Sequence, residues 1–277
     1  MKSVEKYNFE LYPLTPIFIG SNDSWEPNEY LLRDGRIVKV KIDRVLKRIY
    51  QRSEEEVNEF ARASAADLPR AVEILRNELQ EGDIQETYPL KNGFERAYQE
   101  KLASSSEILT VNLPCRHATE SYIPGSSLKG AIRTALYALI GQESNHPPEK
   151  KVFGYKYPFD DPFKRFRISD VNVDNDKFGL RTLQRFNIKD NKPGGPDSYA
   201  ICVNGLIDDA DQDPAEVSSL PEHPELKLSG DVEFVTNFSK MAEHLNVQSI
   251  INATREFSRN IMEYEKTRPV VGKWYSR

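Results

Sequence analysis

The sequence predicts an α+β fold, in which mainly antiparallel strands and helices occupy separate stretches of the chain. Two observations predict it. Short runs alternate apolar and polar residues, as half-buried strands do, and longer segments place apolar residues at helical spacing. The 277 residues, of which 38% are hydrophobic, suffice for one large domain or two small ones, and the chain contains no internal repeat.

The first part of the chain is predicted to form strands. Residues 7–19 alternate apolar and polar types and are rich in aromatic and β-branched side chains. The turn-forming residues at 20–23 predict that this strand stops there. Farther along, Asp34 and Gly35 lie between two apolar runs, which is a strong hairpin signal.

Residues 43–107 are predicted to form a helical insertion. Ser53, followed three residues later by Glu56, is typical of a helix start. A second helix is predicted after Asp67, because Pro69 fits a first helical turn. The apolar stripe of that helix is Leu68, Val72, Leu75 and Leu79.

The rest of the chain predicts a long helix among further strands. Apolar residues recur at helical spacing from Leu128 to Leu139, and Gly141 ends the run. Further elements are expected as strands at 108–113, 166–173, 178–188, 199–207 and 227–237, an exposed turn at 189–197 and a helix at 238–264. This order suits a ferredoxin-like (RRM-like) split βαβ core with insertions. We therefore predict an RRM-like domain over residues 1–235 and a C-terminal helix within 236–277 that starts a second domain.

The composition predicts a cytoplasmic protein. No apolar run approaches the roughly 18 residues of a membrane span. The first residues lack the basic, apolar and small-residue regions of a secretory signal peptide. Cys115 and Cys202 are the only cysteines, too few for a disulfide framework.

The charge is segregated along the chain. A net charge of −5 argues against a nucleic-acid ligand. However, basic residues gather at 36–52 and 164–192, whereas acidic residues gather at 54–107 and in a loop at 208–233 that we expect to face a protein or solvent. This pattern allows a cationic groove within an acidic protein, but charge alone favours solvated faces of helices and strands.

Residues 122–136 (YIPGSSLKGAIRTAL) carry the most informative motif, a loop that leads into a helix. Gly125 permits the close approach of another backbone, and Ser126 or Ser127 can cap the helix. The outward amides and the positive end of the helix dipole then form an anion site. Lys129 and Arg133 are four residues apart and project from one face beside it. The alternative is an ordinary capped helix with a solvated basic face.

This motif resembles the signature of the RAMP superfamily of CRISPR-associated proteins. Residues 14–21 and 161–170 resemble the opening strand and the central strand of one branch, the subunit that caps the 3′ end of the guide RNA in the type III-A Csm complex. The three matches have the family's order and span residues 14–170. Phe18 stands where family members often have histidine. The family also has a second RRM-like domain with its own glycine-rich loop, and because no such loop follows Tyr264 we expect that domain to be missing or truncated.

The resemblance implies a non-catalytic subunit that binds and caps the 3′ end of crRNA and supports its maturation in antiviral defence. The implied partners are single-stranded crRNA, the other subunits of the type III effector complex, including its repeated backbone RAMP subunit, and a recruited host nuclease, with no membrane and no cofactor. Base identity should matter little, because helix amides, Lys and Arg contact phosphates and sugars. The expected RNA-binding residues are Gly20, Ser21, Gly125, Ser126, Ser127, Lys129, Arg133, Lys164, Arg165 and Arg167.

Two alternatives stay open: a RAMP subunit of a type III-B complex, and a metal-independent pre-crRNA endoribonuclease. For the second, His117 beside Arg116 is the one histidine worth testing as a general base. No metal site is expected, because the histidines are scattered. We expect Asp170 to be a hydrogen-bonded carboxylate that holds a strand end or a neighbouring loop.

Aromatic residues near the second basic stretch suit the stacking of RNA bases. Strand alternation nevertheless predicts that Phe166 lies in the core and that Arg165 and Arg167 face the ligand. The aromatic candidates, which lie among Lys156, Lys164, Arg165 and Arg167, are Tyr155, Tyr157, Phe163 and Phe166.

Overall fold

The structure is a computed structural model. It describes residues 3–13, 15–91, 94–104, 109–118, 120–141, 148–183, 186–187, 192–193, 198–205, 226–236 and 246–266. Most of the expected turn at 189–197, most of the acidic loop at 208–233 and the start of the predicted C-terminal helix lie outside these residues. No helix in the described ranges is long and apolar enough to cross a membrane.

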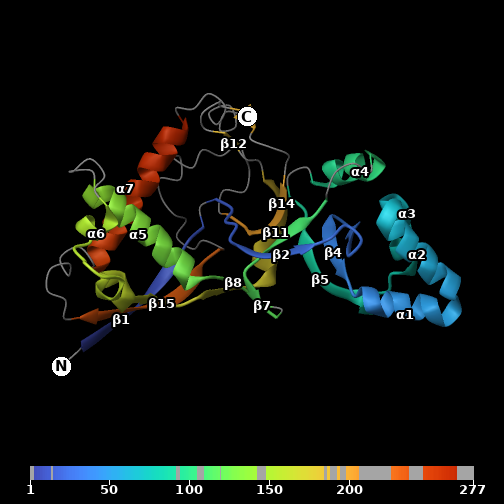
Figure 1. The fold of residues 1–277 in the computed structure, drawn as a ribbon, viewed down its shortest axis with the longest axis horizontal. Coiled ribbons are helices and arrows are strands. Elements are labelled where there is room, and N and C mark those ends of the chain that lie inside the picture. The colour runs from blue at the N-terminus through green and yellow to red at the C-terminus, as the bar shows by residue number, and fades with distance from the viewer. Residues whose placement is uncertain are drawn as a thin grey trace. The chain divides into compact units, whose positions relative to one another are not determined.

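Contacts divide the chain into two compact units, whose elements are drawn in Figure 1. The first unit comprises Met1–Thr15, Ser121–Val173 and Gly205–Arg277, and the second comprises Pro16–Glu120 and Asp174–Asn204. This grouping differs from the predicted boundary after residue 235, since the first unit is built from both ends and the middle of the chain.

The first unit contains a split βαβ arrangement. Its main elements are β1 (Ser3–Leu11), α5 (Gly125–Gly141), β9 (Phe166–Ile168), β15 (Leu228–Thr236) and α7 (Val247–Lys266). Strands β1 and β9 each pair antiparallel with β15, which lies between them. Since β1 and β9 flank the same antiparallel strand, they run parallel to each other, and α5 lies between them in the sequence. This is the expected ferredoxin-like order, so the α+β class is confirmed.

Shorter elements complete the first unit. They are β8 (Glu120–Ile123), α6 (Glu149–Val152), the 3-10 turns η3 (Pro158–Asp160) and η4 (Pro162–Arg165), and β10 (Val171–Val173). β8 leads into α5 and pairs antiparallel with β10. Helices α5 and α7 pack against each other, and α7 thereby completes the core of this unit. The buried residues are Ala135, Leu136, Phe153, Phe163, Phe166, Val232, Ile250 and Ala253.

The second unit contains two sheets. The four-stranded sheet has the order β11 (Phe178–Leu183), β14 (Ser198–Val203), β6 (Val111–Pro114) and β2 (Gly20–Trp25). The three-stranded sheet has the order β3 (Tyr30–Arg33), β4 (Arg36–Val40) and β5 (Ile84–Pro89). The remaining short elements are η1 (Glu81–Asp83), β7 (Arg116–His117), η5 (Asn175–Lys177), β12 (Phe186–Asn187) and β13 (Lys192–Pro193).

The predicted hairpin is confirmed, but the predicted turn before it is wrong. β3 and β4 pair antiparallel around Asp34 and Gly35, whose φ angles of 52° and 69° are both positive, as a type I′ turn requires. Residues 20–23 do not form a turn, because β2 continues through them and pairs with β6. The register shifts between Gly20 and Ser24, and Asn22 has a φ of 69°. The turn-forming residues therefore accommodate an irregularity within a strand.

The stretch at 43–107 is helical except in its middle. It contains α1 (Ile42–Arg52), α2 (Glu54–Ala66), α3 (Leu68–Glu78) and α4 (Phe94–Ser104). The predicted helix starts are confirmed, since the side chains of Ser53 and Asp67 accept hydrogen bonds from the amides of Glu56 and Arg70. The expectation of helix throughout is wrong at β5, whose backbone pairs with β4.

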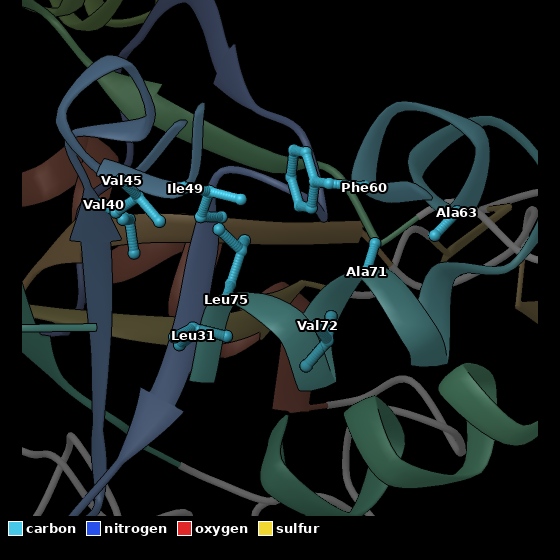
Figure 2. Packing of buried hydrophobic residues seen from close by; sticks show 9 residues of the cluster. All are labelled: Leu31, Val40, Val45, Ile49, Phe60, Ala63, Ala71, Val72 and Leu75. Atoms are coloured by element: carbon cyan, nitrogen blue, oxygen red, sulfur yellow. The ribbon is translucent and has the colours of Figure 1, made fainter. Parts of the chain in front are cut away.

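The helices α1–α3 bury their apolar faces together against strands β3 and β4 (Figure 2). The predicted stripe of α3 is confirmed, because Val72 and Leu75 are buried and Leu68 and Leu79 pack partly buried against this core. The buried members of the core are Leu31, Val40, Val45, Ile49, Phe60, Ala63, Ala71, Val72 and Leu75.

Candidate nucleic-acid interface

The first turn of α5 is fixed by contact with the connection between β9 and β10. A Cβ atom at Gly125 would lie 2.2 Å from the carbonyl oxygen of Ile168 and 2.6 Å from that of Ser169. The Gly125 amide donates a hydrogen bond of 2.7 Å to Oδ1 of Asp170. The expected close approach therefore occurs, and the approaching backbone is the protein's own. Asp170 holds a neighbouring loop, as predicted.

The amides at the start of α5 are mostly engaged. Those of Ser127 and Leu128 donate to the carbonyl of Pro124, at 2.9 and 3.2 Å. Ser126 is exposed, and its amide has no hydrogen-bond partner in the part of the chain that the structure describes. The carboxylate of Asp170, rather than Ser126 or Ser127, caps this helix end, and its negative charge offsets the helix dipole. The amides therefore form a weaker anion site than the sequence predicts.

Arg133 is enclosed by its own protein. Its guanidinium lies 2.8 Å from Oδ2 of Asp161 and 2.9 Å from Oε2 of Glu149. Its carbon Cζ lies 5.0 and 4.9 Å from the ring centroids of Phe153 and Phe163. These contacts join α5 to residues 149–163, so Arg133 holds that segment in place. Its predicted contact with RNA stays a prediction, and most of its donors are already engaged.

Lys129, one turn before Arg133, has no such partner. It is half-buried, and among the described residues it makes no hydrogen bond or ion pair. Burial lowers the pKa of its ammonium; Asp161 opposes the shift, and the positive charges of Arg133 and Arg167 reinforce it. A partly buried amine beside two positive charges, whose one nearby carboxylate is already paired with Arg133, is stabilised by an anion that binds beside it.

The other cations of this region differ in how far they are engaged. Arg167 has a side chain that is 71% exposed, and its nearest carboxylate, Glu233, lies 3.9 Å away. Glu233 is already held at 2.7 Å by Lys6, which also lowers its pKa. Lys164 is exposed and, within the described ranges, has no ion-pair partner. Arg165 is half-buried and already interacts with another group of the protein. We call Lys129, Lys164 and Arg167 the open cations.

The two predicted RNA-binding residues near the N-terminus lie in the other unit. Gly20 and Ser21 belong to β2, and the Ser21 hydroxyl donates to the carbonyl of Leu113 at 3.4 Å and accepts from the amide of Asp23. The structure thus brings together the predicted residues of α5, η4 and β9 within the first unit, whereas Gly20 and Ser21 belong to the second unit.

In the first basic stretch, at 36–52, three of the seven cations pair with carboxylates of the second unit, and two more bind neutral oxygens. Arg48 pairs with the buried carboxylate of Asp83 at 2.6 Å, and its hydrogen bond lowers the pKa of that carboxyl group. Arg52 pairs with both Glu56 and Glu78. The other engaged members are Arg36 with Thr87, Lys39 with Glu29, and Arg44 with the carbonyl of Gly82. For this stretch the interpretation as a cationic groove is not supported.

Arg116, the cation expected to assist His117 in catalysis, is engaged in an ion pair. His117 is exposed on β7, whereas Arg116 beside it pairs with Glu86 at 3.1 Å. Glu86 also accepts a hydrogen bond from the hydroxyl of Tyr88. The described residues contain no group of three or more His, Cys, Asp or Glu side chains arranged to hold a metal ion.

The aromatic candidates separate into core and surface. Phe163 and Phe166 are buried, the latter as predicted, and Tyr155 is half-buried beside Arg133. Tyr157 is exposed and stacks on Phe159, which our sequence analysis did not single out. The signal was present in the sequence, since Phe159 follows Tyr157 by two residues across a proline.

Comparisons with known proteins agree with this architecture. The structure resembles the crystal structure of T. onnurineus Csm5, with a TM-score of 0.65 and 15% identity, covering 96% of this chain and 82% of that chain. It also resembles a chain of the Csm–crRNA–target RNA ternary complex of a type III-A CRISPR–Cas system, with a TM-score of 0.63 and 15% identity, covering 96% and 80%. At such identities the likeness establishes the fold. No curated protein matches the sequence. The sequence matches the family model of the RAMP superfamily over residues 10–265. The chain therefore belongs to the RAMP superfamily.

Proposed function

We propose that this chain is a non-catalytic, RNA-binding subunit of a type III-A CRISPR–Cas (Csm) effector complex, which binds and caps the 3′ end of crRNA and supports its maturation. Membership of the RAMP superfamily and the likeness in fold to Csm5 support the proposal. The observation that carries it is the group of open cations, Lys129, Lys164 and Arg167, on α5, η4 and β9. Its other implied partners are the remaining subunits of the complex and a recruited nuclease.

In this proposal the open cations bind phosphates, and their neighbours keep them in position. Asp170 fixes the start of α5, and Arg133 ties residues 149–163 to the same helix. Contacts with phosphates carry no sequence information, so binding tolerates any base sequence. A phosphate beside Lys129 also supplies a direct ion pair, which this ammonium does not make with the described residues.

The direct test is the salt dependence of RNA binding. A fluorescently labelled single-stranded RNA is titrated with wild-type protein and with Lys129→Ala/Arg167→Ala at several salt concentrations. Because each lost phosphate contact removes about 0.7 from the slope of log K against log salt on single strands, the slope should fall by about 1.4. The affinity at low salt should fall by about tenfold or more, from the usual value of hydrogen bonds to charged groups.

The matched control removes the same two residue types from the second unit. Lys47 and Arg62 are exposed on α1 and α2, and Lys47→Ala/Arg62→Ala should leave both the affinity and the slope unchanged. If the Lys129 and Arg167 variant behaves like this control, the proposed RNA site is wrong.

Two further measurements separate the proposal from its alternatives. Co-purification from a host with a type III-A or a type III-B system identifies which subunits accompany the chain. Incubation of the pure protein with labelled repeat RNA in EDTA tests for metal-independent cleavage. Intact RNA supports the binder, and cleavage that is lost in His117→Ala would identify an endoribonuclease instead.

A further inference from the structure

The first unit carries two aromatic rings that take no part in its core. Tyr157 and Phe159 have ring centroids 5.2 Å apart and ring planes only 7° from parallel. They are 48% and 68% exposed, whereas Phe153, Phe163 and Phe166 nearby are buried. Single exposed apolar residues are ordinary on protein surfaces, but two large rings held parallel in water need a reason. The packing of the core does not supply one.

The backbone of the segment that carries these rings is fixed by hydrogen bonds and an ion pair. Pro158 fixes the first turn of η3, and the amide of Asp160 donates to the carbonyl of Tyr157 at 2.9 Å. On one side, the amide of Tyr155 donates to the carbonyl of Lys150. On the other, Asp161 is clamped by Arg133 and caps η4. Binding to the rings therefore costs little ordering of the backbone.

The surroundings of the rings are cationic. The ammonium of Lys156 lies 5.3 Å from the centroid of the Tyr157 ring. Of the acidic residues in this segment, Glu149 and Asp161 are paired with Arg133, which leaves Asp160 exposed. The exposed lysines that flank the rings in the sequence are Lys150, Lys151, Lys156 and Lys164. A polyanion with flat apolar groups satisfies both features, and single-stranded nucleic acid is such a ligand.

We propose that Tyr157 and Phe159 form a stacking platform for an unpaired base of single-stranded RNA, with Lys156 beside the adjoining phosphate. This inference rests on the proposed function and adds a base-binding element to a site that otherwise binds phosphates. Phe159, the more exposed ring, receives the base. Any of the four bases fits, because every base has a π-face, so the platform adds affinity without sequence preference.

The test compares two RNAs that differ only in their bases. One is an ordinary single strand, and the other carries a run of abasic nucleotides with the phosphates retained. Each is titrated with wild-type protein and with Tyr157→Leu/Phe159→Leu, which keeps apolar bulk but removes both rings. Wild type should prefer the ordinary strand by roughly tenfold, within the range measured for stacking of one base, and the variant should bind the two strands alike.

A fluorescent base supplies a second readout. 2-Aminopurine placed in the strand should be quenched on binding to wild type, because stacking quenches it, and should stay bright with the variant. Tyr50→Leu is the matched control, since Tyr50 is 60% exposed on α1, and it should keep the full preference and the quenching. Tyr157, Phe159 and Tyr50 are all exposed, so the thermal unfolding temperature should be unchanged in both variants.

The outcomes separate this inference from the proposed function. If wild type binds neither strand, both are overturned. If wild type binds both strands equally, and Lys129→Ala/Arg167→Ala still weakens binding, the platform alone is overturned. If the Tyr157 and Phe159 variant keeps its preference for bases but loses a co-purifying subunit of the complex, the rings are a protein-docking surface and the inference is likewise overturned.

Discussion

Cations of the stretch at 36–52 and the open cations differ in their partners. In residues 36–52, cations such as Arg48 and Arg52 lie within 2.8 Å of carboxylates of their own unit. Around α5 and β9, Lys129 makes no ion pair among the described residues and feels only the charge of Asp161, which Arg133 already holds; Arg167 is 3.9 Å from a carboxylate that another lysine already holds. A high density of basic residues in the sequence therefore does not make each of them available.

This difference teaches that availability, rather than number, marks a binding cation. A paired guanidinium must lose its carboxylate before it gains a phosphate, so its net gain from RNA is small. An open cation exchanges only water and counterions for the phosphate. We propose that the paired cations of the first stretch, such as Arg48 and Arg52, stabilise the fold and that the open cations bind RNA, and the predictions below challenge that division.

The largest effect is expected at the turn that supports the open cations. Gly125→Ala places a methyl group 2.2 Å from the carbonyl oxygen of Ile168, so the backbone must shift. We expect the free energy of unfolding to fall by about 3 kcal/mol, the upper part of the range for overpacked sites. Denaturant or thermal unfolding monitored by circular dichroism measures it.

The control for this prediction lies in the same helix. A Cβ atom at Gly130 meets nothing within 4 Å, and the residue is exposed. Gly130→Ala should therefore stabilise α5 by up to about 1 kcal/mol, as alanine does in helix interiors. If both substitutions change stability equally, the close approach at Gly125 does not exist.

The next effect tests a paired cation. Arg48→Ala removes the ion-pair partner of Asp83, whose side chain is 4% exposed, and leaves its carboxylate the hydrogen bond from the Gln80 amide. We expect a loss of about 1–3 kcal/mol, the cost of an unsatisfied buried polar group, with RNA affinity unchanged. A loss of RNA affinity at wild-type stability would invert the assigned roles.

The same pair predicts an acid dependence. Because Arg48 holds the pKa of Asp83 below its usual value, the pair stabilises the fold above the unfolded-state pKa of 3.8, and this contribution is lost as pH falls through the folded-state value. Wild type should therefore exceed Arg48→Ala in stability most at neutral pH and least in strong acid, below about pH 4.

A smaller loss is expected at the cap of α5. Asp170→Ala removes the acceptor of the Gly125 amide and should cost about 1 kcal/mol, the usual value of a helix N-cap. Asp170→Asn keeps an acceptor and should cost less. Equal losses for the two variants would mean that charge, rather than the hydrogen bond, holds this turn.

The smallest effect is a pH dependence of RNA binding. Since the pKa of Lys129 is lowered, its charge is lost at a lower pH than that of an ordinary lysine. As the pH rises toward 10.5, the ordinary lysine pKa, the affinity of wild type should fall as Lys129 deprotonates, whereas Lys129→Arg stays charged and should hold its affinity. Parallel curves for the two proteins would show that Lys129 does not contact the RNA.

Much of the fold follows from local sequence signals. The hairpin at Asp34-Gly35, the helix start at Ser53 and the apolar stripe of α3 all depend on neighbouring residues, and the structure confirms them. β5 and β2 were mispredicted, because their strand character comes from pairing with β4 and β6 rather than from their own residues. The division into two units depends on long-range contacts that no local pattern encodes.

The candidate site was predictable only in part. The motif at 122–136 identified the right turn and Lys129, but spacing alone could not reveal that Arg133 meets Asp161 and Glu149. Likewise, sequence could not tell that Asp170, 45 residues away, caps the helix in place of Ser126. These partners come from distant elements, and they decide which groups remain free.

The most direct measurement is a map of where RNA contacts the protein. A single-stranded RNA carrying 4-thiouridine is photo-crosslinked to the whole chain, and the modified peptides are identified by mass spectrometry. The open cations and the ring pair Tyr157 and Phe159 predict crosslinks in residues 124–133 and 156–167. Crosslinks concentrated in residues 36–52 instead would contradict the division between paired and open cations.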